Sequence, residues 1–547
     1  MLFYFILTIL HCVLILYIEP MALFLYLKGE YRMSKNVFLN QMTKSLNLTE
    51  VPNGAIMNKS TLNSLLDLFG RIGSLRQCSE REITDLFDRA YKEDSLRAIK
   101  CVFYAGDILE GQGERRTFRV LMRHIAINYT QALKNNLNLI PELNRWDSIY
   151  ALFDTPLEEA AIDLIKHQIL ADLKSDKPSL CAKWLKSCNT SSKESCKLGK
   201  KTARLLNLGN FSNPNSFEYK KKNEFIYRKV LSNLRERINV VEKKMSSGNW
   251  GDINYNHVPS RAMNIYQNAF TRQDRERYEE YVKGLSTGKS TINSKALYPY
   301  EIVKKVLRGQ IRSDIDKGIA NAQWDSLPNY ITNPEMKGLC VVDVSGSMGG
   351  TPIEVAIATG LYVAEKCTGT YHNKFITFSS SPQIVDVKGD NIVEKIKNME
   401  RADWGYNTNL ESVFNLILQT AIKNKSPQSD IPEYLIILTD MGWDRLEGNS
   451  RYRGFGNNTF IESIRARFEN AGYKLPVLVL WNIDSEVYPM TVDENGWISV
   501  SGYSPSVFKA LLSEELLGAE DLEAEKINPI DAMLVVLDSD RYKIISI

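Results

Sequence analysis

Three side chains that carry oxygen atoms alternate along the chain at Asp343, Ser345 and Ser347, directly after the apolar run Leu339–Val342. A short apolar run that ends in Asp, Gly and Ser is typical of a buried strand that breaks into a loop. Because the three side chains alternate along this loop, their oxygen atoms can converge on one point. One carboxylate with two hydroxyls suits Mg²⁺ or Mn²⁺ and leaves room for water ligands. The pattern therefore predicts a divalent-metal site.

Two later stretches can complete this site. Residues 406–410 supply the hydroxyl of Thr408 just before an expected helix, and Tyr434–Asp440 is a second buried-strand pattern that ends in a carboxylate. Ligands of an open α/β sheet bind beyond the carboxyl ends of its strands, where these loops would meet. Taken singly, each residue is equally well explained as a helix N-cap or a turn former. The ordered set favours a metal site made of Asp343, Ser345, Ser347, Thr408 and Asp440.

This ordered set resembles the metal-ion-dependent adhesion site of the von Willebrand factor A family. The resemblance implies direct ligation by Ser345, Ser347 and Thr408, and contact from Asp343 and Asp440, often through water. It also implies an open coordination position for an acidic group of a partner. The cofactor implied is a divalent cation, Mg²⁺ first, with Mn²⁺ or Ca²⁺ as alternatives. The fold implied for residues 335–547 is an α/β doubly wound, Rossmann-like domain.

Strand and helix patterns alternate through the same region, which argues for a mostly parallel sheet covered on both faces. Strands are expected at Lys374–Phe378, Tyr434–Leu438 and Leu475–Trp481. Helices are expected at Ile353–Lys366, Leu410–Ile422, Phe460–Ala471 and Pro505–Leu512.

A chain of 547 residues is too long for one hydrophobic core and should hold two or three domains. Its formal net charge of +3 hides an asymmetry. From Glu335 onward there are 19 Lys and Arg against 30 Asp and Glu, a net charge of −11, and the residues before it carry a net charge of +14. One acidic half and one basic half indicate different partners.

The basic half reads as helices rather than strands. Ser79–Glu82 is a capping box, and Leu62 to about Asp176 reads as consecutive short helices joined by short turns. This pattern predicts an all-α, helical-repeat domain over residues 33–334. The later segment Gly284–Ser290, GLSTGKS, is one residue too short between its glycines for a phosphate-binding loop and follows a helical pattern.

Positive charge is concentrated between Lys193 and Lys244. This segment contains 14 Lys and Arg residues and 5 Glu residues, with aromatic residues among them. Basic side chains neutralise phosphates, and aromatic faces can stack on unpaired bases. The alternative is a solvated helix face with core aromatics. The residues expected to contact RNA are Lys220, Lys221, Lys222, Arg228, Lys229, Arg235 and Arg237.

A second resemblance covers nearly all of the chain after Met33. Seven motifs resemble an uncharacterised family that joins a helical domain to a von Willebrand factor A domain: residues 89–91, 111–115, 145–147, 182–185, 258–260, 298–300 and 501–505. That architecture is similar to the TROVE module of the Ro autoantigen, a ring of HEAT-like helical repeats. The resemblance implies binding of small non-coding or misfolded RNA, as in a ribonucleoprotein. It transfers no base-contacting residue.

The first 32 residues contain the apolar run Leu2–Ile18, continued by Met21–Leu27. Taken literally, this run is a membrane anchor near the minimum spanning length. The alternative is that translation begins at Met33, and this is the interpretation that we favour. The eight cysteines show no CxxC pair and no zinc-like spacing, so we expect reduced thiols in a cytoplasmic protein.

These patterns favour a non-enzymatic RNA-binding protein whose metal-bearing domain regulates the assembly or binds a partner. The alternative is a metal-ion-dependent protein-interaction module that needs no nucleic acid. Catalysis is not expected, because the sequence shows no poised general base, no nucleophile elbow and no carboxylate cluster for a second metal. No small-molecule substrate is expected. A membrane partner is expected only if residues 2–27 are translated.

Overall fold

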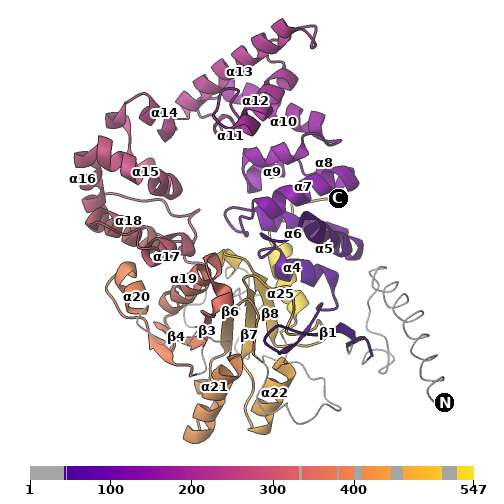
Figure 1. The fold of residues 1–547 in the computed structure, drawn as a ribbon, viewed down its shortest axis with the longest axis vertical. Coiled ribbons are helices and arrows are strands. Elements are labelled where there is room, and N and C mark those ends of the chain that lie inside the picture. Colours follow the sequence, from indigo (N-terminus) through magenta and orange to yellow (C-terminus); the bar gives the residue numbers. More distant parts are fainter. Residues whose placement is uncertain are drawn as a thin grey trace, which may run out of the picture. The chain divides into compact units, whose positions relative to one another are not determined.

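The structure is a computed structural model, and it describes residues 42–44, 46–238, 240–331, 336–378, 381–399, 409–444, 460–507 and 527–547. The chain divides into two compact units (Figure 1). The α/β unit combines the residues up to Val102 with Tyr298–Gln310 and Asn329–Lys543. The helical unit combines Phe103–Leu297, Ile311–Pro328 and Ile544–Ile547. Each unit is therefore assembled from separate stretches of the chain.

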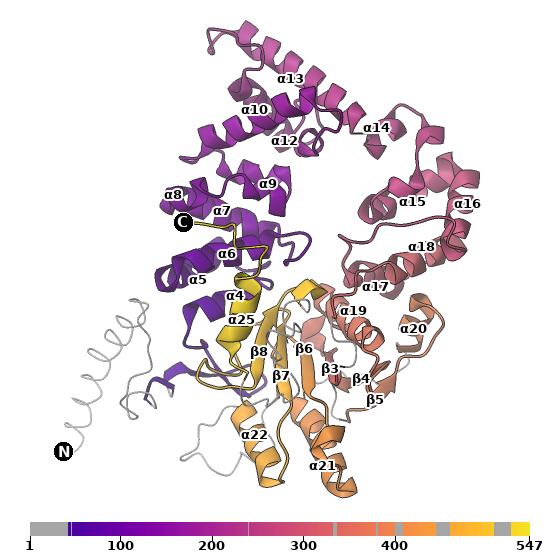
Figure 2. The same ribbon diagram turned by 180° about the vertical axis from the view of Figure 1, so that it is seen from behind.

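A six-stranded sheet forms the centre of the α/β unit (Figures 1 and 2). The strands lie in the order β5-β4-β3-β6-β7-β8, and only β5 runs antiparallel to its neighbour. Chain order thus adds strands on one side of β3 first and then on the other, which creates a switch point beside β3. The strands are β3 (Gly338–Asp343), β4 (Lys374–Phe378), β5 (Ile384–Asp386), β6 (Tyr434–Thr439), β7 (Val477–Asn482) and β8 (Trp497–Ser501).

The central strands are buried along their whole length. Every residue of β3, β6 and β7 is buried, as expected of parallel strands that are covered on both faces. Helix α19 packs against β3, β4 and β6, α21 packs against β4, and α25 packs against β8. The helices that follow the strands are α19 (Thr351–Lys366), α20 (Ile392–Met399), α21 (Leu410–Asn424), α22 (Phe460–Asn470) and α25 (Pro529–Leu537).

The early part of the chain completes the α/β unit. Helix α4 packs against β8, and the backbone N–H of Gly73 donates to the Ser501 hydroxyl at 3.0 Å. A Cβ at Gly73 would lie 2.6 Å from the Cα of Gly502, so this close approach requires glycine. Helix α17 (Pro299–Leu307) packs against α19 and α20. The early elements are β1 (Leu48–Glu50), β2 (Ile56–Asn58), α4 (Ser64–Arg71), α5 (Glu80–Glu93) and the start of α6 (Ser95–Gly106).

The helical unit is built from short helices around aromatic side chains. One core cluster centres on Tyr255, whose ring lies 5.1 Å from that of Tyr278, 5.2 Å from Phe270 and 5.4 Å from Tyr281. The α-helices of the helical unit are α7 (Arg116–Asn128), α8 (Thr130–Lys134), α9 (Leu139–Leu143), α10 (Glu158–Lys174), α11 (Cys181–Trp184), α12 (Lys193–Leu206), α13 (Phe217–Arg237), α14 (Val241–Ser246), α15 (Ser260–Gln273), α16 (Arg275–Ser286) and α18 (Asp314–Asp325). Its 3-10 turns are η2 (Trp146–Leu152), η3 (Trp250–Asp252) and η4 (Tyr255–His257).

The expected combination of a helical part with an α/β part is confirmed, and the predicted strands at 374–378, 434–438 and 475–481 are present within two residues. The two units differ from the arrangement predicted from the sequence, in which two consecutive domains meet near residue 334. Residues 46–102 and 298–310 join the α/β unit, because α4 packs on β8 and α17 packs on α19. Pro505–Val507 is a short 3-10 turn, and the rest of the expected helix 505–512 lies outside the described residues.

The N-terminal extension, residues 1–32, also lies outside the described residues. Within the described ranges, no helix combines the length and the hydropathy needed to cross a membrane.

Candidate functional site

The candidate metal ligands lie at one edge of the sheet. Strand β3 ends at Asp343, and its parallel neighbour β6 ends at Thr439, one residue before Asp440. Val342 pairs with Leu438 in the register of the two strands, so Asp343 is level with Thr439, and Asp440 follows one residue later. Ser347 lies in the 3-10 turn Gly346–Met348 that follows β3. This edge is the position at which an open α/β sheet binds its ligands.

Hydrogen bonds hold the loop after β3 in a compact form. The hydroxyl oxygens of Ser345 and Ser347 lie 3.1 Å apart, close enough to contact one ion. One carboxylate oxygen of Asp343 accepts from the Ser345 N–H at 2.9 Å, and the other accepts from the Thr439 hydroxyl at 2.7 Å. An Asp440 oxygen accepts from the Gly442 N–H at 3.0 Å. The donor set therefore fits a hard divalent cation such as Mg²⁺.

The electrostatics of Asp343 favour a cation. Its side chain is fully buried, and this burial raises the pKa of the carboxyl group to about 6, with a further increase from nearby Asp440. Hydrogen bonds from Ser345 and Thr439 oppose this increase. A carboxylate that is buried beside a second one is stabilised by an adjacent positive charge. An ion bound here would supply that charge and a Lewis-acidic coordination position for an anionic group.

Four of the five predicted ligands are thus described at this edge, and Thr408 lies outside the described residues. Sequence reasoning missed the hydroxyl of Thr439, which also accepts from the Trp443 indole N–H at 3.2 Å. It also missed Asp484, which follows β7 and whose pKa is raised by burial and by Asp440. The signal for Asp484 was available, because it is a carboxylate just beyond the end of a predicted strand.

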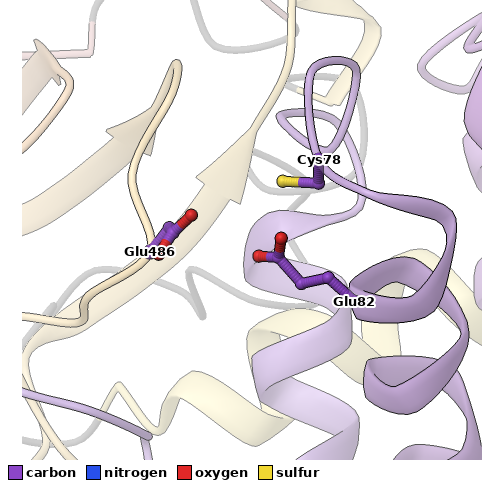
Figure 3. A group of neighbouring side chains, drawn as sticks. All are labelled: Cys78, Glu82 and Glu486. Atoms are coloured by element: carbon purple, nitrogen blue, oxygen red, sulfur yellow. The ribbon is translucent and has the colours of Figure 1, made fainter.

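A second group of possible metal ligands lies elsewhere in the α/β unit. Cys78, Glu82 and Glu486 point toward one another, with their ligand atoms within 4.8 Å (Figure 3). Burial raises the pKa of the Cys78 thiol to about 11, so the thiol is protonated at neutral pH and is a poor ligand. The Arg71 guanidinium donates to Glu82 at 2.7 Å and lies 3.8 Å from the Cys78 sulfur. Arg71 therefore already supplies positive charge to this group.

The basic residues predicted to contact RNA lie on α13, and they separate into two kinds. Arg235 donates to the carbonyls of Ala182 and Leu185, both at 2.8 Å, and to the Ser187 hydroxyl at 2.9 Å. Arg237 donates to carbonyl oxygens of residues 172, 173 and 175. Burial lowers the pKa of Arg235. Both guanidinium groups bind the protein's own backbone, so they hold α13 against the preceding segment.

The other side of α13 is exposed. Phe217 and Phe225 are 71% and 49% exposed. The ammonium group of Lys221 lies 4.4 Å from the Phe217 ring centre, and that of Lys229 lies 4.7 Å from the Phe225 ring centre. Exposed Arg228 lies three residues beyond Phe225, on the same side of the helix. We call Phe217, Lys221, Phe225, Arg228 and Lys229 the α13 face.

Most of the remaining aromatic and basic side chains of α13 have partners within the protein. Tyr219 and Tyr227 are buried, and their hydroxyls donate to the carbonyls of Arg204 and Lys186, both at 2.9 Å. Lys222 forms an ion pair with Glu218 at 2.5 Å. Lys220 is half-buried. The predicted mixture of aromatic and basic residues is therefore sorted by helical periodicity into a buried tyrosine side and an exposed phenylalanine side.

Comparisons with known proteins give similarities on both parts of the chain. Residues 337–536 match a family model described as Domain of unknown function (DUF7788), and residues 144–333 match one described as Domain of unknown function (DUF2828). The chain is 29% identical over 535 residues to an uncharacterised protein of Acanthamoeba polyphaga mimivirus, across 90% of this chain and 87% of that relative. The similarity thus extends over most of both proteins.

Proposed function

We propose that this chain is a non-enzymatic RNA-binding protein whose α13 face contacts single-stranded or irregular RNA. The observation that carries the proposal is the exposure of Phe217 and Phe225 beside lysine side chains. Each of the two phenyl rings has a lysine ammonium group beside it, so apolar and basic groups alternate along one side of the helix. Phenyl rings stack on unpaired bases, and adjacent Lys and Arg neutralise the phosphates between them. In this proposal the helical unit is a TROVE-like module.

Binding of a fluorescein-labelled 20-nucleotide single-stranded RNA, followed by anisotropy, tests the proposal. Stacking contributes about 1–3 kcal/mol per base, so Phe217→Ala with Phe225→Ala should weaken binding by at least tenfold. The matched control is Ile265→Ala on α15, since Ile265 is 70% exposed in the same unit. Equal loss in the control, or unchanged affinity in the phenylalanine variant, would contradict the proposal. Duplex RNA of the same length should bind more weakly, because its bases are already stacked.

A second candidate function rests on the α/β unit, which we propose to be a von Willebrand factor A-like domain. The observation in its favour is the convergence of the Ser345 and Ser347 hydroxyls beside Asp343. Asp343, Ser345, Ser347 and Asp440 would hold Mg²⁺, and the open coordination position would accept a carboxylate of a protein partner. Metal binding here would regulate the RNA assembly or bind that partner.

Thermal unfolding with and without Mg²⁺ tests the metal site. Ion binding to the folded state should raise the unfolding temperature, and excess EDTA should remove the increase. The double variant Ser345→Ala with Ser347→Ala should abolish the response, because it removes both hydroxyl ligands. The control is Ser246→Ala, since Ser246 is exposed on α14 in the helical unit. The site is disproved if Mg²⁺ acts equally on all three proteins.

A further inference from the structure

A polar cavity of about 720 Å³ lies in the helical unit, between the turns at residues 251–256 and the end of α16 with the loop that follows it. Its volume falls within the range of small-molecule sites. Its lining residues all lie between Gly251 and Ser290, so it is separate from the α13 face in sequence. The aromatic core cluster around Tyr255 and Tyr281 forms its floor.

One wall is fixed by Arg277. Its guanidinium donates to the carbonyl oxygens of Trp250 at 2.9 Å and Ile253 at 2.8 Å, and to the Asp274 carboxylate at 2.8 Å. The Tyr255 hydroxyl donates to the same carboxylate, also at 2.8 Å. These bonds tie the turn at residues 250–255 to α16. The wall is therefore preorganised, which lowers the free-energy cost of binding a ligand.

The GLSTGKS segment, Gly284–Ser290, supplies a second part of the lining. The Ser290 N–H donates to the Gly284 carbonyl at 3.1 Å, and the Thr287 hydroxyl donates to it at 3.2 Å. A Cβ at Gly284 would lie 2.3 Å from the Ser290 hydroxyl oxygen, so glycine lets the loop fold directly onto the helix. The Thr291 N–H donates to the Asn256 side-chain oxygen at 2.8 Å and joins this loop to the first wall.

The polar groups left for a ligand include several donors. The side-chain oxygens of Asn254 and Asn256 already accept backbone N–H groups, so their amide NH₂ groups remain as donors. Lys283 and Lys289 are exposed at the rim, and in the described part of the chain neither forms an ion pair. Two carboxylates, Asp252 and Glu280, also line the cavity. Such a cavity suits a ligand that joins an anionic group to a ring with its own N–H donors.

We propose that this cavity binds a nucleoside monophosphate group. Lys283 and Lys289 would contact the phosphate oxygens, and the asparagine amides and the carboxylates would hydrogen-bond the edge of the base. The same chemistry is offered by a free mononucleotide and by one nucleotide of an RNA chain. The proposal does not depend on the α13 face, because that face and this cavity share no residue.

Isothermal titration of the full chain with AMP, GMP, CMP and UMP, and with the four nucleosides, tests the proposal. At least one mononucleotide should bind, and its nucleoside should bind at least tenfold more weakly, because it lacks the phosphate. The variant Lys283→Glu with Lys289→Glu should weaken mononucleotide binding at least tenfold. Lys295→Glu is the matched control, since Lys295 is exposed in the same region and does not line the cavity.

Titration with the 20-nucleotide RNA separates the two sources of the ligand. A mononucleotide that binds and is lost in the double lysine variant identifies a free nucleotide. If no mononucleotide binds but RNA affinity falls in that variant, the source is one nucleotide of an RNA chain. If neither ligand responds, the proposal is overturned, while a loss of RNA binding in the α13 variants would still support the proposed function. The milder variant Lys283→Gln with Lys289→Gln, checked by circular dichroism, guards against misfolding.

Discussion

Asp343 is fully buried at the end of a central strand, whereas Phe217 and Lys221 are exposed on the surface of a helix. The candidate metal centre thus keeps charge inside the protein, where burial raises the pKa of Asp343. The α13 face keeps apolar rings outside. A buried carboxylate is costly unless it is paired, and exposed phenyl rings leave apolar surface in water. In the two functions proposed above, each region would take a ligand of opposite character: a cation beside Asp343, and bases with phosphates on the α13 face.

The largest effect that would test this comparison concerns pH in the metal-free protein. Folding raises the pKa of Asp343 from its usual value of 3.8 to about 6. Between these values the folded protein holds a proton that the unfolded chain has lost, so Asp343 stabilises the fold below pH 4. That contribution disappears as the pH rises through about 6, and the loss amounts to about 3 kcal/mol at most.

Urea unfolding in EDTA at pH 4 and pH 8, with and without Asp343→Asn, measures this effect. The wild-type chain should lose more stability than the variant between the two pH values. Added Mg²⁺ should restore part of the loss at pH 8 in the wild-type chain alone. Identical pH dependence in both proteins would mean that the Asp343 carboxylate is not held at a cost.

A smaller effect should separate the two kinds of arginine on α13. Arg235→Ala removes three hydrogen bonds to the segment 182–187 and should lower the free energy of unfolding by about 2 kcal/mol. Arg228→Ala, on the α13 face, should change stability by less than about 0.5 kcal/mol. RNA affinity should respond in the opposite way, falling in Arg228→Ala and staying constant in folded Arg235→Ala. A loss of RNA affinity in both variants would remove the distinction.

The smallest expected effect is on the salt dependence of RNA binding. For single strands, each phosphate contact contributes about 0.7 to the slope of log K against log salt concentration. Lys221→Ala and Lys229→Ala should each lower the slope by about that amount. Lys222→Ala serves as the control, because Lys222 is paired with Glu218 and should lower the slope less. Anisotropy titrations at KCl concentrations between about 50 and 300 mM would measure this slope.

Local sequence patterns predicted the sheet well, because each central strand is a short apolar run bounded by polar residues. The same runs placed Asp343 and Asp440 at one edge, since parallel strands end together. No local pattern indicates the role of Arg235, because its hydrogen-bond partners lie about 50 residues earlier in the chain. Helical periodicity alone could have separated Tyr219 and Tyr227 from Phe217 and Phe225. It could not show that residues 46–102 complete the α/β unit.

The completion of the α/β unit by residues 46–102 has a consequence for synthesis on the ribosome. The hydrogen bond between Gly73 and Ser501 joins residues 428 positions apart, and α4 packs on β8. At about 5–20 residues per second, roughly 20 to 90 s pass between the translation of the two partners. During that interval the apolar side of α4 has no β8 to cover it, while the helical unit, whose residues lie mostly between, is already emerging. The α/β unit therefore cannot complete its packing until almost the whole chain has been synthesised.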